Sequence, residues 1–199
     1  MMAKQHLVVF AKAPRLGNVK TRLAADIGPV AASGFYRRTL NDVLRRLASD
    51  RRWTCHLAVT PDRAVDGHRF WPRPFNAIGQ GPGDLGERMN RVFQDLPPGP
   101  VVLVGTDVPG IRAAHITDAF RALGNNDAVF GPARDGGYWL VGARRRPVVP
   151  DLFGGITWST PRTLKDTLTK LNGKKVALLD PLDDIDDGAA YEKLITGAL

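Results

Sequence analysis

The sequence has 199 residues, of which 43% are hydrophobic, and its formal net charge is +8 at pH 7. This length is typical of one domain, which we place over residues 1–199, and the apolar fraction is enough for a core of ordinary size. No run of about 18 apolar residues is present, which excludes a membrane-spanning helix. The sequence has no apolar stretch of the kind found in a secretory signal, and one cysteine cannot form an internal disulfide, so we expect a cytoplasmic protein.

The positive charge favours polyanionic partners such as nucleic acid, a membrane surface or phosphorylated small molecules. Much of it is scattered arginine, but Lys12, Arg15, Lys20 and Arg22 lie within eleven positions that contain no acid. This basic group directly follows an apolar run at 7–10. Neither zinc-finger spacing nor an aromatic ribonucleoprotein motif is present, which weakens the nucleic-acid interpretation.

The first half of the chain alternates short apolar runs with an amphipathic segment. Helical spacing of apolar residues predicts a helix at about 31–48. A polar stretch with Pro72 and Pro74 predicts a loop. The expected strands are 6–11, 53–60 and, less regular in pattern, 75–78.

The second half continues the alternation. A glycine-rich turn at 79–83 precedes Asp84, which is suited to cap a helix running to about Leu96. Thr160 followed by Pro161 predicts another helix start, with the hydroxyl as cap and the proline at the first helical position. Further helices are expected at 113–123, at about 161–171 and at 189–195. Further strands are expected at 101–104, 128–130, 138–141 and 175–179.

Strands interleaved with helices predict an α/β fold with a mostly parallel sheet covered on both faces. In open sheets of this kind, ligands bind outside the carboxyl ends of the strands. The basic loop follows the first expected strand, and acidic loops follow three later ones, with Asp107 three positions after the end of the apolar run 101–104. We therefore expect cations and carboxylates to meet at one edge of the sheet.

That combination suits a nucleoside di- or triphosphate, whose charge is neutralised by basic side chains and by a divalent cation on a few carboxylates. Asp107 is the best metal-ligand candidate, and Asp135 with one of Asp186 or Asp187 could complete the site. Asp107 and Asp135 are also the candidate catalytic residues. The nucleotide- and phosphate-binding candidates are Lys12, Arg15, Gly17, Lys20, Arg22, Asp84 and Arg88. The candidates on the acceptor side are Gly136, Gly137, Tyr138, Trp158 and Ser159.

Each of these assignments has a structural alternative. Asp107 before Val-Pro-Gly fits a turn, and Asp135-Gly136-Gly137 fits a hairpin turn. Asp84 with Arg88 fits helix capping and local pairing, and the acidic run 180–187 fits a solvated face whose Asp186 or Asp187 caps the last helix. No histidine–acid pattern accompanies Ser159, so a serine nucleophile is not expected.

Six segments in order, KAPRLGNVKTRLA, GDLGERM, GTDVPGI, GPARDGGYWLVG, ITWST and LDDIDD, resemble one bacterial glycosyltransferase-A-like family of unknown function, also described as radical-SAM/selenodomain-associated transferase 1. The resemblance covers about residues 6–194. It implies a three-layer α/β/α sandwich with a mostly parallel, Rossmann-like sheet of the nucleotide-diphospho-sugar transferase (GT-A) type. It also implies nucleotide binding at the strand ends with Mg²⁺ or Mn²⁺.

By the family pattern, Asp107 matches the metal-binding aspartate, and Lys12, Lys20 and Arg22 match the basic block beside the phosphates. Two features depart from typical relatives. The opening loop has one glycine and K-T-R in place of a glycine pair with R-M-G-x-x-K, and the strand tip offers Thr106-Asp107 rather than a D-x-D.

Three functions remain open. The leading hypothesis is a metal-dependent transferase that uses a nucleotide-activated donor, with glycosyl transfer from a nucleotide-diphospho-sugar to a small acceptor. The alternative is a nucleotidyltransferase that joins GTP or CTP to a small phosphorylated acceptor and releases pyrophosphate. The third is a non-catalytic basic module that binds nucleic acid, which acidic loops at the same edge would disfavour.

Overall fold

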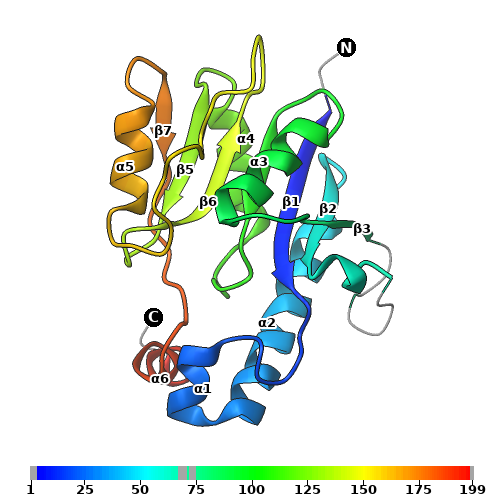
Figure 1. Cartoon of the computed structure of the whole chain (residues 1–199), viewed down its shortest axis with the longest axis vertical. Coiled ribbons are helices and arrows are strands. Elements are labelled where there is room, and N and C mark those ends of the chain that lie inside the picture. Colours follow the sequence, from blue (N-terminus) through cyan, green and yellow to red (C-terminus); the bar gives the residue numbers. More distant parts are fainter. Residues whose placement is uncertain (1–3, 67–70, 72–74, 198–199) are drawn as a thin grey trace.

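The computed structural model describes residues 4–66, 71 and 75–197. Its centre is a seven-stranded sheet in the order β3-β2-β1-β4-β6-β5-β7 (Figure 1). The strands are β1 (Gln5–Lys12), β2 (Trp53–Thr60), β3 (Asn76–Gly79), β4 (Val101–Val104), β5 (Ala128–Pro132), β6 (Tyr138–Ala143) and β7 (Val176–Leu178). The helices are α1 (Thr21–Ile27), α2 (Pro29–Ala48), α3 (Leu85–Asp95), α4 (Ala113–Ala122), α5 (Thr163–Lys170) and α6 (Gly188–Thr196), and a 3₁₀ turn spans Asp62–Ala64.

Strand direction decides where the loops meet. β1 is parallel to β2 and β4, β2 is parallel to β3, and β5 is parallel to β7. β6 is antiparallel to both of its neighbours, β4 and β5. All strands except β6 therefore run in one direction, and their carboxyl ends share the edge at the bottom of Figure 1.

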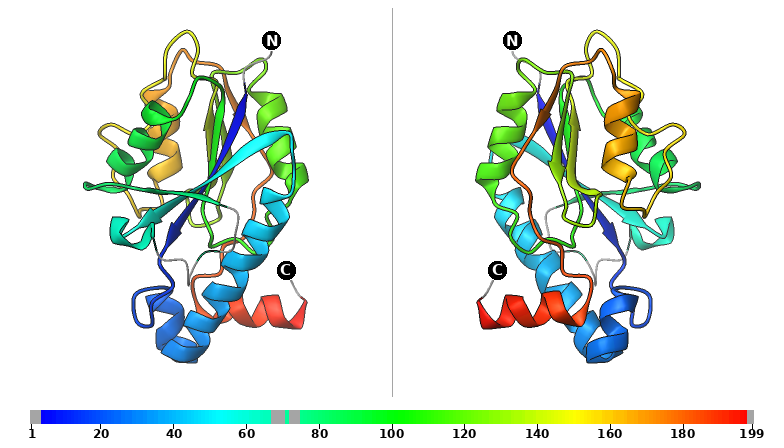
Figure 2. Two further views of the ribbon diagram at one scale, coloured as in Figure 1. Left: turned by 90° about the vertical axis from the view of Figure 1, so that its right-hand side faces the viewer. Right: turned by 90° about the vertical axis from the view of Figure 1, so that its left-hand side faces the viewer.

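Helices cover both faces of the sheet (Figure 2). On one face, α2 and α4 pack against strand residues such as Leu7 and Val9, and on the other α3 and α5 pack against residues such as Val8 and Phe130. Successive residues of β1 thus enter opposite cores, as the alternation of side chains along a strand requires. This arrangement is the α/β fold with a mostly parallel sheet that the sequence predicts.

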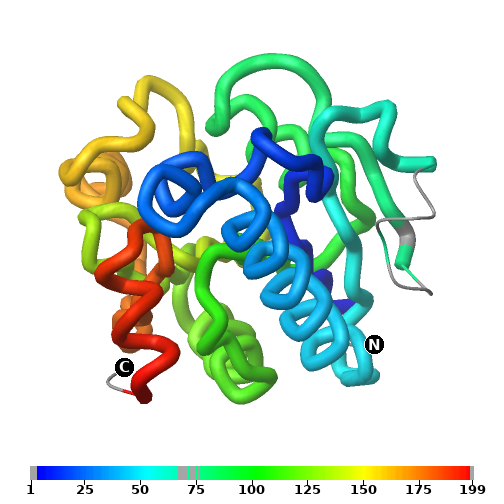
Figure 3. Tube along the Cα trace, turned by 90° about the horizontal axis from the view of Figure 1, so that it is seen from below, coloured from blue at the N-terminus to red at the C-terminus, as the bar shows by residue number. Residues whose placement is uncertain are grey.

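A smaller apolar cluster lies beyond the carboxyl edge. Leu23 of α1, Phe35 of α2 and Ile185, just before α6, are buried against one another. Phe35 also meets Tyr191 edge to face, with ring centroids 5.3 Å apart. Seen from below in Figure 3, α1, the start of α2 and α6 lie over that edge of the sheet. This cluster packs the first two helices of the chain against the last helix and the residues just before it.

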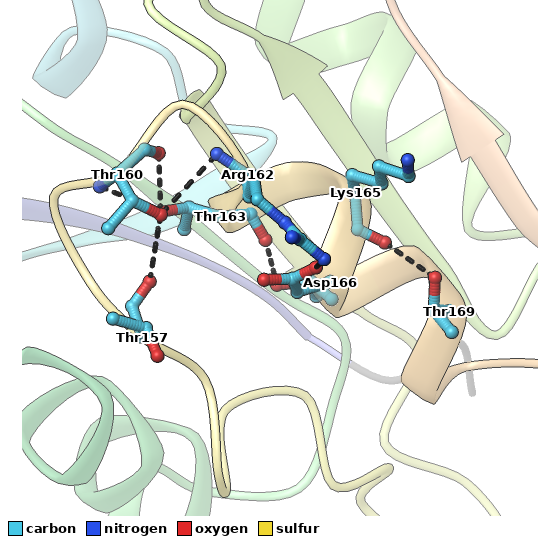
Figure 4. Close-up of polar contacts among 8 residues, drawn as sticks. Thr157, Thr160, Arg162, Thr163, Lys165, Asp166 and Thr169 are labelled. Atoms are coloured by element: carbon cyan, nitrogen blue, oxygen red, sulfur yellow. Dashed lines mark hydrogen bonds and ion pairs between the residues drawn. The ribbon is translucent and has the colours of Figure 1, made fainter.

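Two element predictions need correction. The helix α1 was not predicted, because its seven residues carry little apolar periodicity and only Leu23 is buried. The helix α5 begins at Thr163 rather than at Pro161. Figure 4 shows the reason: the Thr163 hydroxyl donates to the carbonyl oxygens of Thr157 at 3.2 Å and Thr160 at 2.9 Å, which closes a tight turn before the helix.

The predicted loop around Pro72 and Pro74 lies outside the described residues. The assignment of residues 1–199 to a single domain stays a prediction. Among the residues that the structure describes, none of the helices has the length and apolar content needed to cross a bilayer.

Candidate functional site

A cavity of about 460 Å³ opens at the carboxyl edge of the sheet. Its walls come from the ends of β1 and β4, from the start of β6, and from the segments that precede α1, α3 and α5. The residues 184 and 186 of the C-terminal segment complete it. A volume of this size is typical of small-molecule sites, and the position is the one expected for open α/β sheets.

One wall is organised around the ammonium group of Lys20. Its Nζ lies 2.6 Å from Oδ1 of Asp107 and 2.8 Å from Oδ1 of Asp186. The Lys20 side chain is only 4% exposed, whereas those of Asp107 and Asp186 are 52% and 40% exposed. Arg22 approaches the other oxygen of Asp186 at 3.8 Å from the solvent side. A buried cation therefore joins two carboxylates whose outer faces remain open.

A backbone hydrogen bond explains why these two acids meet. The Ile185 N–H donates to the carbonyl oxygen of Asp107 at 3.1 Å, and the Ile185 side chain is fully buried in the cluster beneath the sheet edge. The neighbours of Ile185 are thereby fixed beside the end of β4. Asp187, one residue further on, accepts from the Ala190 N–H and caps α6. Asp186, not Asp187, is thus the residue that reaches the cavity.

The two carboxylates affect the pKa of Lys20 more than its burial does. Burial alone would lower the pKa of this ammonium group, but Asp107 and Asp186 favour the charged form and raise its pKa overall. At the half-buried Asp184 the charged form is disfavoured instead, because burial and the nearby charges of Asp186 and Asp135 raise the pKa of its carboxyl group. This wall therefore holds more acid than Lys20 alone balances.

The end of β1 is held by Tyr36 of α2. Its hydroxyl donates to the Lys12 carbonyl oxygen and accepts from the Lys12 N–H, both at 2.9 Å. The Thr106 hydroxyl donates to the Tyr36 hydroxyl oxygen at 3.4 Å. Burial, as the main cause, raises the pKa of Tyr36 to about 12, so the phenol stays protonated. Tyr36 thus fixes the ends of β1 and β4 relative to each other, with the Lys12 side chain left exposed.

Another part of the cavity wall contains Gln80 and Arg88, which contact each other. The Gln80 amide donates to the carbonyl oxygens of Ala11 at 3.1 Å and Ala58 at 2.9 Å. Its Oε1 accepts from Nη1 of Arg88 at 3.2 Å. Gln80 is 2% exposed, and both it and Arg88 line the cavity. A buried amide therefore contacts a further cation of the cavity, in addition to Lys12, Lys20 and Arg22.

Aromatic rings form the remaining side. Trp158 lies edge to face with Tyr138, with centroids 6.4 Å apart, and packs over Gly86 at the start of α3. A Cβ at Gly86 would lie 2.6 Å from the indole, so only glycine allows this approach. Burial raises the pKa of Tyr138, which stays protonated. Flat apolar surface next to cations suits a ligand that carries both a ring and phosphates.

A comparison with protein-family models matches residues 43–160 to DUF2064, described as an uncharacterized protein conserved in bacteria. The chain belongs to the DUF2064 family. A crystal structure of a protein from Desulfovibrio desulfuricans G20, provisionally named a nucleotide-diphospho-sugar transferase, is 32% identical and superposes with a TM-score of 0.86. That match covers 97% of this chain and 87% of the relative.

More distant structures share the fold with this DUF2064 protein. A CMP:2-keto-3-deoxy-manno-octonic acid synthetase complexed with CTP is 12% identical, with a TM-score of 0.61 over 99% of this chain and all of that one. Rv0371c from Mycobacterium tuberculosis H37Rv, crystallised with manganese, is 15% identical, with a TM-score of 0.57 over 98% of this chain and all of that one. No curated protein matches the sequence. The fold is therefore that of nucleotide-diphospho-sugar transferase-like proteins.

The side chains of this DUF2064 protein offer few ligands for a metal ion. No group of three or more His, Cys, Asp or Glu side chains arranged for a metal ion occurs in residues 4–66, 71 and 75–197. Two carboxylates, from Asp107 and Asp186, nevertheless converge on one cation, the Lys20 ammonium group. Mg²⁺ is usually held by one or two carboxylates with substrate phosphates and water. The donor set fits such an ion together with a phosphate ligand.

The structure brings most of the sequence-predicted residues of this DUF2064 protein to one cavity. Those that line it are Lys12, Lys20, Arg22, Arg88, Asp107, Asp135, Gly137, Tyr138, Trp158, Ser159 and Asp186. Arg15, Gly17, Asp84 and Gly136 are not among its lining residues.

The structure shows local contacts or turn conformations for these four residues. Gly17 has φ +78 in the turn of the basic loop, and Arg15 accepts there from the Asn18 N–H through its carbonyl oxygen. The Asp84 carboxylate accepts from the Glu87 N–H at 2.8 Å and caps α3. Gly136, with φ +87, forms part of the hairpin that leads into β6.

Sequence reasoning missed Tyr36, Gln80 and Asp184 as parts of this site. Gln80 follows directly after β3, so the rule that ligands bind at strand ends could have found it within the glycine-rich turn. Asp184 was one of several acids in an acidic run, and no local pattern separates it from its neighbours. Tyr36 lies in the middle of α2, where its spacing indicates only a core position.

Proposed function

We propose that this protein is a transferase that binds a nucleotide-activated donor in the cavity and transfers a glycosyl group from it. The observation that carries the proposal is the buried Lys20 ammonium group between Asp107 and Asp186, with Arg88 lining the same cavity. Support comes also from the relative named for nucleotide-diphospho-sugar transfer, which is 32% identical over 97% of the chain.

The residues divide the work by charge. The basic side chains that line the cavity supply donors for phosphate oxygens, and arginine does so through a planar fork. They are Lys12, Lys20, Arg22 and Arg88. A Mg²⁺ or Mn²⁺ ion held by Asp107 and Asp186 would offset charge on the leaving diphosphate. Lys20 would then contact the donor phosphates as well as its two acids. The Trp158 and Tyr138 rings would exclude water from the side where the acceptor lies.

A second candidate is nucleotidyl transfer. It is favoured by the structural similarity to a synthetase crystallised with CTP, although at 12% identity that similarity shows only the fold. The same cations would bind a triphosphate, and pyrophosphate would leave in place of a nucleoside diphosphate. The products therefore separate the two candidates.

The first test is a thermal-shift panel of nucleoside diphosphates, triphosphates and nucleotide sugars, each with and without Mn²⁺. A ligand present at 100 times its Kd adds about 2.7 kcal/mol to the free energy of unfolding, which raises Tm measurably. Asp107→Asn should bind nucleotide more weakly and lose the Mn²⁺ dependence. The matched control is Asp118→Asn, whose acid pairs with Arg121 on the surface of α4.

Product analysis by ³¹P NMR would follow for the nucleotide that binds. Nucleoside diphosphate from a nucleotide sugar supports glycosyl transfer, and pyrophosphate from a triphosphate supports the second candidate. Binding that needs no divalent metal, or Asp107→Asn with unchanged metal dependence, would contradict the mechanism. Salt-sensitive binding of duplex DNA without any nucleotide binding would instead support a nucleic-acid module.

A further inference from the structure

Gln80 is a buried polar residue of the cavity to which the proposed mechanism gives no part. It is 2% exposed, lies between the ends of β1 and β2 and the start of α3, and lines the cavity. Buried amides are costly unless their hydrogen bonds are made. The partners of this side chain therefore show which orientation the fold requires.

The hydrogen bonds of Gln80 leave one orientation only. Both donor positions of the side-chain amide are used, by the carbonyl oxygens of Ala11 and Ala58. Carbonyl oxygens accept and never donate, so the NH₂ group must face them and Oε1 must face the other way. The group that Oε1 meets is Nη1 of Arg88, at 3.2 Å. The carboxyl ends of two strands thus determine where an acceptor for Arg88 stands.

The backbone of Gln80 is fixed as well. Its N–H donates to the Val59 carbonyl oxygen at 3.0 Å, and its carbonyl oxygen accepts from Nη1 of Arg91 at 2.6 Å. Arg91 also donates to the Pro82 carbonyl oxygen at 3.1 Å, on the far side of the glycine-rich turn. The side-chain amide therefore projects from a turn that is held at both ends.

Arg88 is held without being neutralised. Its Nε donates to the Asp84 carbonyl oxygen at 3.1 Å and its Nη1 donates to Gln80, which uses two of the five N–H groups of a guanidinium. In the part of the chain that the structure describes, no acid lies within ion-pair distance of Arg88. A positioned guanidinium with free donors and no acid is suited to an anion, and its fork matches a phosphate.

From these contacts we infer that Gln80 is a positioning residue, which orients Arg88 so that its free N–H groups receive the phosphate of the bound nucleotide. This inference rests on the proposed function for the identity of the anion. Gln80 itself acts through Arg88, and its effect on binding should disappear when Arg88 is removed. The chemistry that it serves is recognition of a nucleoside diphosphate at the part of the cavity wall that contains Arg88.

The test is a double-mutant cycle with Gln80→Met, Arg88→Met and the double variant. Kd is measured by calorimetry for the nucleoside diphosphate that gives the largest thermal shift, and for inorganic pyrophosphate. We expect Arg88→Met to weaken binding about 10- to 50-fold, as for one charge-assisted contact, and Gln80→Met about 5- to 20-fold. The double variant should match Arg88→Met alone. Arg121→Met, which removes a surface arginine of α4 that pairs with Asp118, is the control and should change Kd less than threefold.

A second measurement does not depend on the folding of Gln80→Met. In protein labelled with ¹⁵N-arginine, the guanidinium signals of Arg88, assigned by their loss in Arg88→Lys, should show hindered rotation in the free protein and move when nucleotide binds. Averaged signals like those of an exposed arginine would overturn the inference. The inference would also be overturned if wild-type protein binds nucleotide and the losses of binding free energy in the two single variants add up in the double variant. Wild-type protein that binds no nucleotide and no pyrophosphate would overturn the proposed function, and the role of Gln80 in phosphate binding with it.

Discussion

Replacing Lys20 with methionine should destabilise the folded protein, because it removes the cation that two carboxylates share. At an effective dielectric constant of about 20, unit charges about 4 Å apart attract by about 4 kcal/mol. Asp107 and Asp186 have 52% and 40% of their side chains exposed, so water screens much of this attraction. Burying the Lys20 ammonium group offsets a further part. We therefore expect Lys20→Met to lower the free energy of unfolding by about 2 kcal/mol at pH 7.

Urea unfolding followed by tryptophan fluorescence measures this loss, and Lys12→Met is the control. Lys12 is the last residue of β1 and belongs to the same basic group, but its side chain is exposed and takes part in no ion pair within the described residues, so its loss should change stability by less than about 0.5 kcal/mol. The pKa of Lys20 is raised on folding, so its stabilisation is complete below the unfolded value of 10.5 and fades only as the pH rises through the folded pKa. A Lys20→Met protein as stable as wild type at pH 7 would show that the ammonium group is not held as described.

Three further predictions concern other parts of the molecule. The rings of His6 and His56 contact each other at 3.1 Å, and burial lowers the pKa of both, that of His56 to about 4. The free energy of unfolding should therefore fall by up to about 3 kcal/mol as the pH drops from 6.5 to 4. Urea unfolding should show this pH dependence in the wild type and not in a protein with both histidines replaced by glutamine. Burial raises the pKa of Cys55 to about 12, so its thiol should react with Ellman's reagent at pH 8 only after unfolding, and rapid reaction of native protein would contradict this. Gly86→Ala should displace the Trp158 indole, shift its fluorescence and cost about 1–3 kcal/mol in urea unfolding, whereas an unchanged spectrum would refute the close contact.

Local sequence patterns were sufficient for most of the fold. The strand β4 has the predicted bounds, because four consecutive apolar residues between turn signals are typical of a buried strand. The alternation of strands and helices predicted parallel pairing, and parallel pairing places all strand ends but one at the same edge. That rule placed Asp107 and the basic loop together before any contact was known.

The remaining features depend on contacts between distant segments. The direction of β6 cannot be obtained from its own residues, since an apolar strand pairs in either direction. The choice of Asp186 over Asp187 follows from the docking of Ile185 beneath the sheet edge, a contact between residues 185 and 107 that no local pattern contains. The orientation of the Gln80 amide likewise depends on carbonyl oxygens from two other strands.

The backbone of Lys20 supports a functional origin for its ion pairs. Lys20 precedes α1 with φ 48 and ψ 48, a left-handed conformation that costs a residue with a Cβ about 1–2 kcal/mol. Glycine or asparagine would adopt it at lower cost, and no side-chain cap is made for α1 there. The stabilisation of about 2 kcal/mol expected from its two ion pairs is roughly offset by this cost, so stability alone gives lysine little advantage over glycine at this position. Positions where a local conformational rule is broken are those where function is expected, and here the conformation directs a cation into the cavity rather than into solvent.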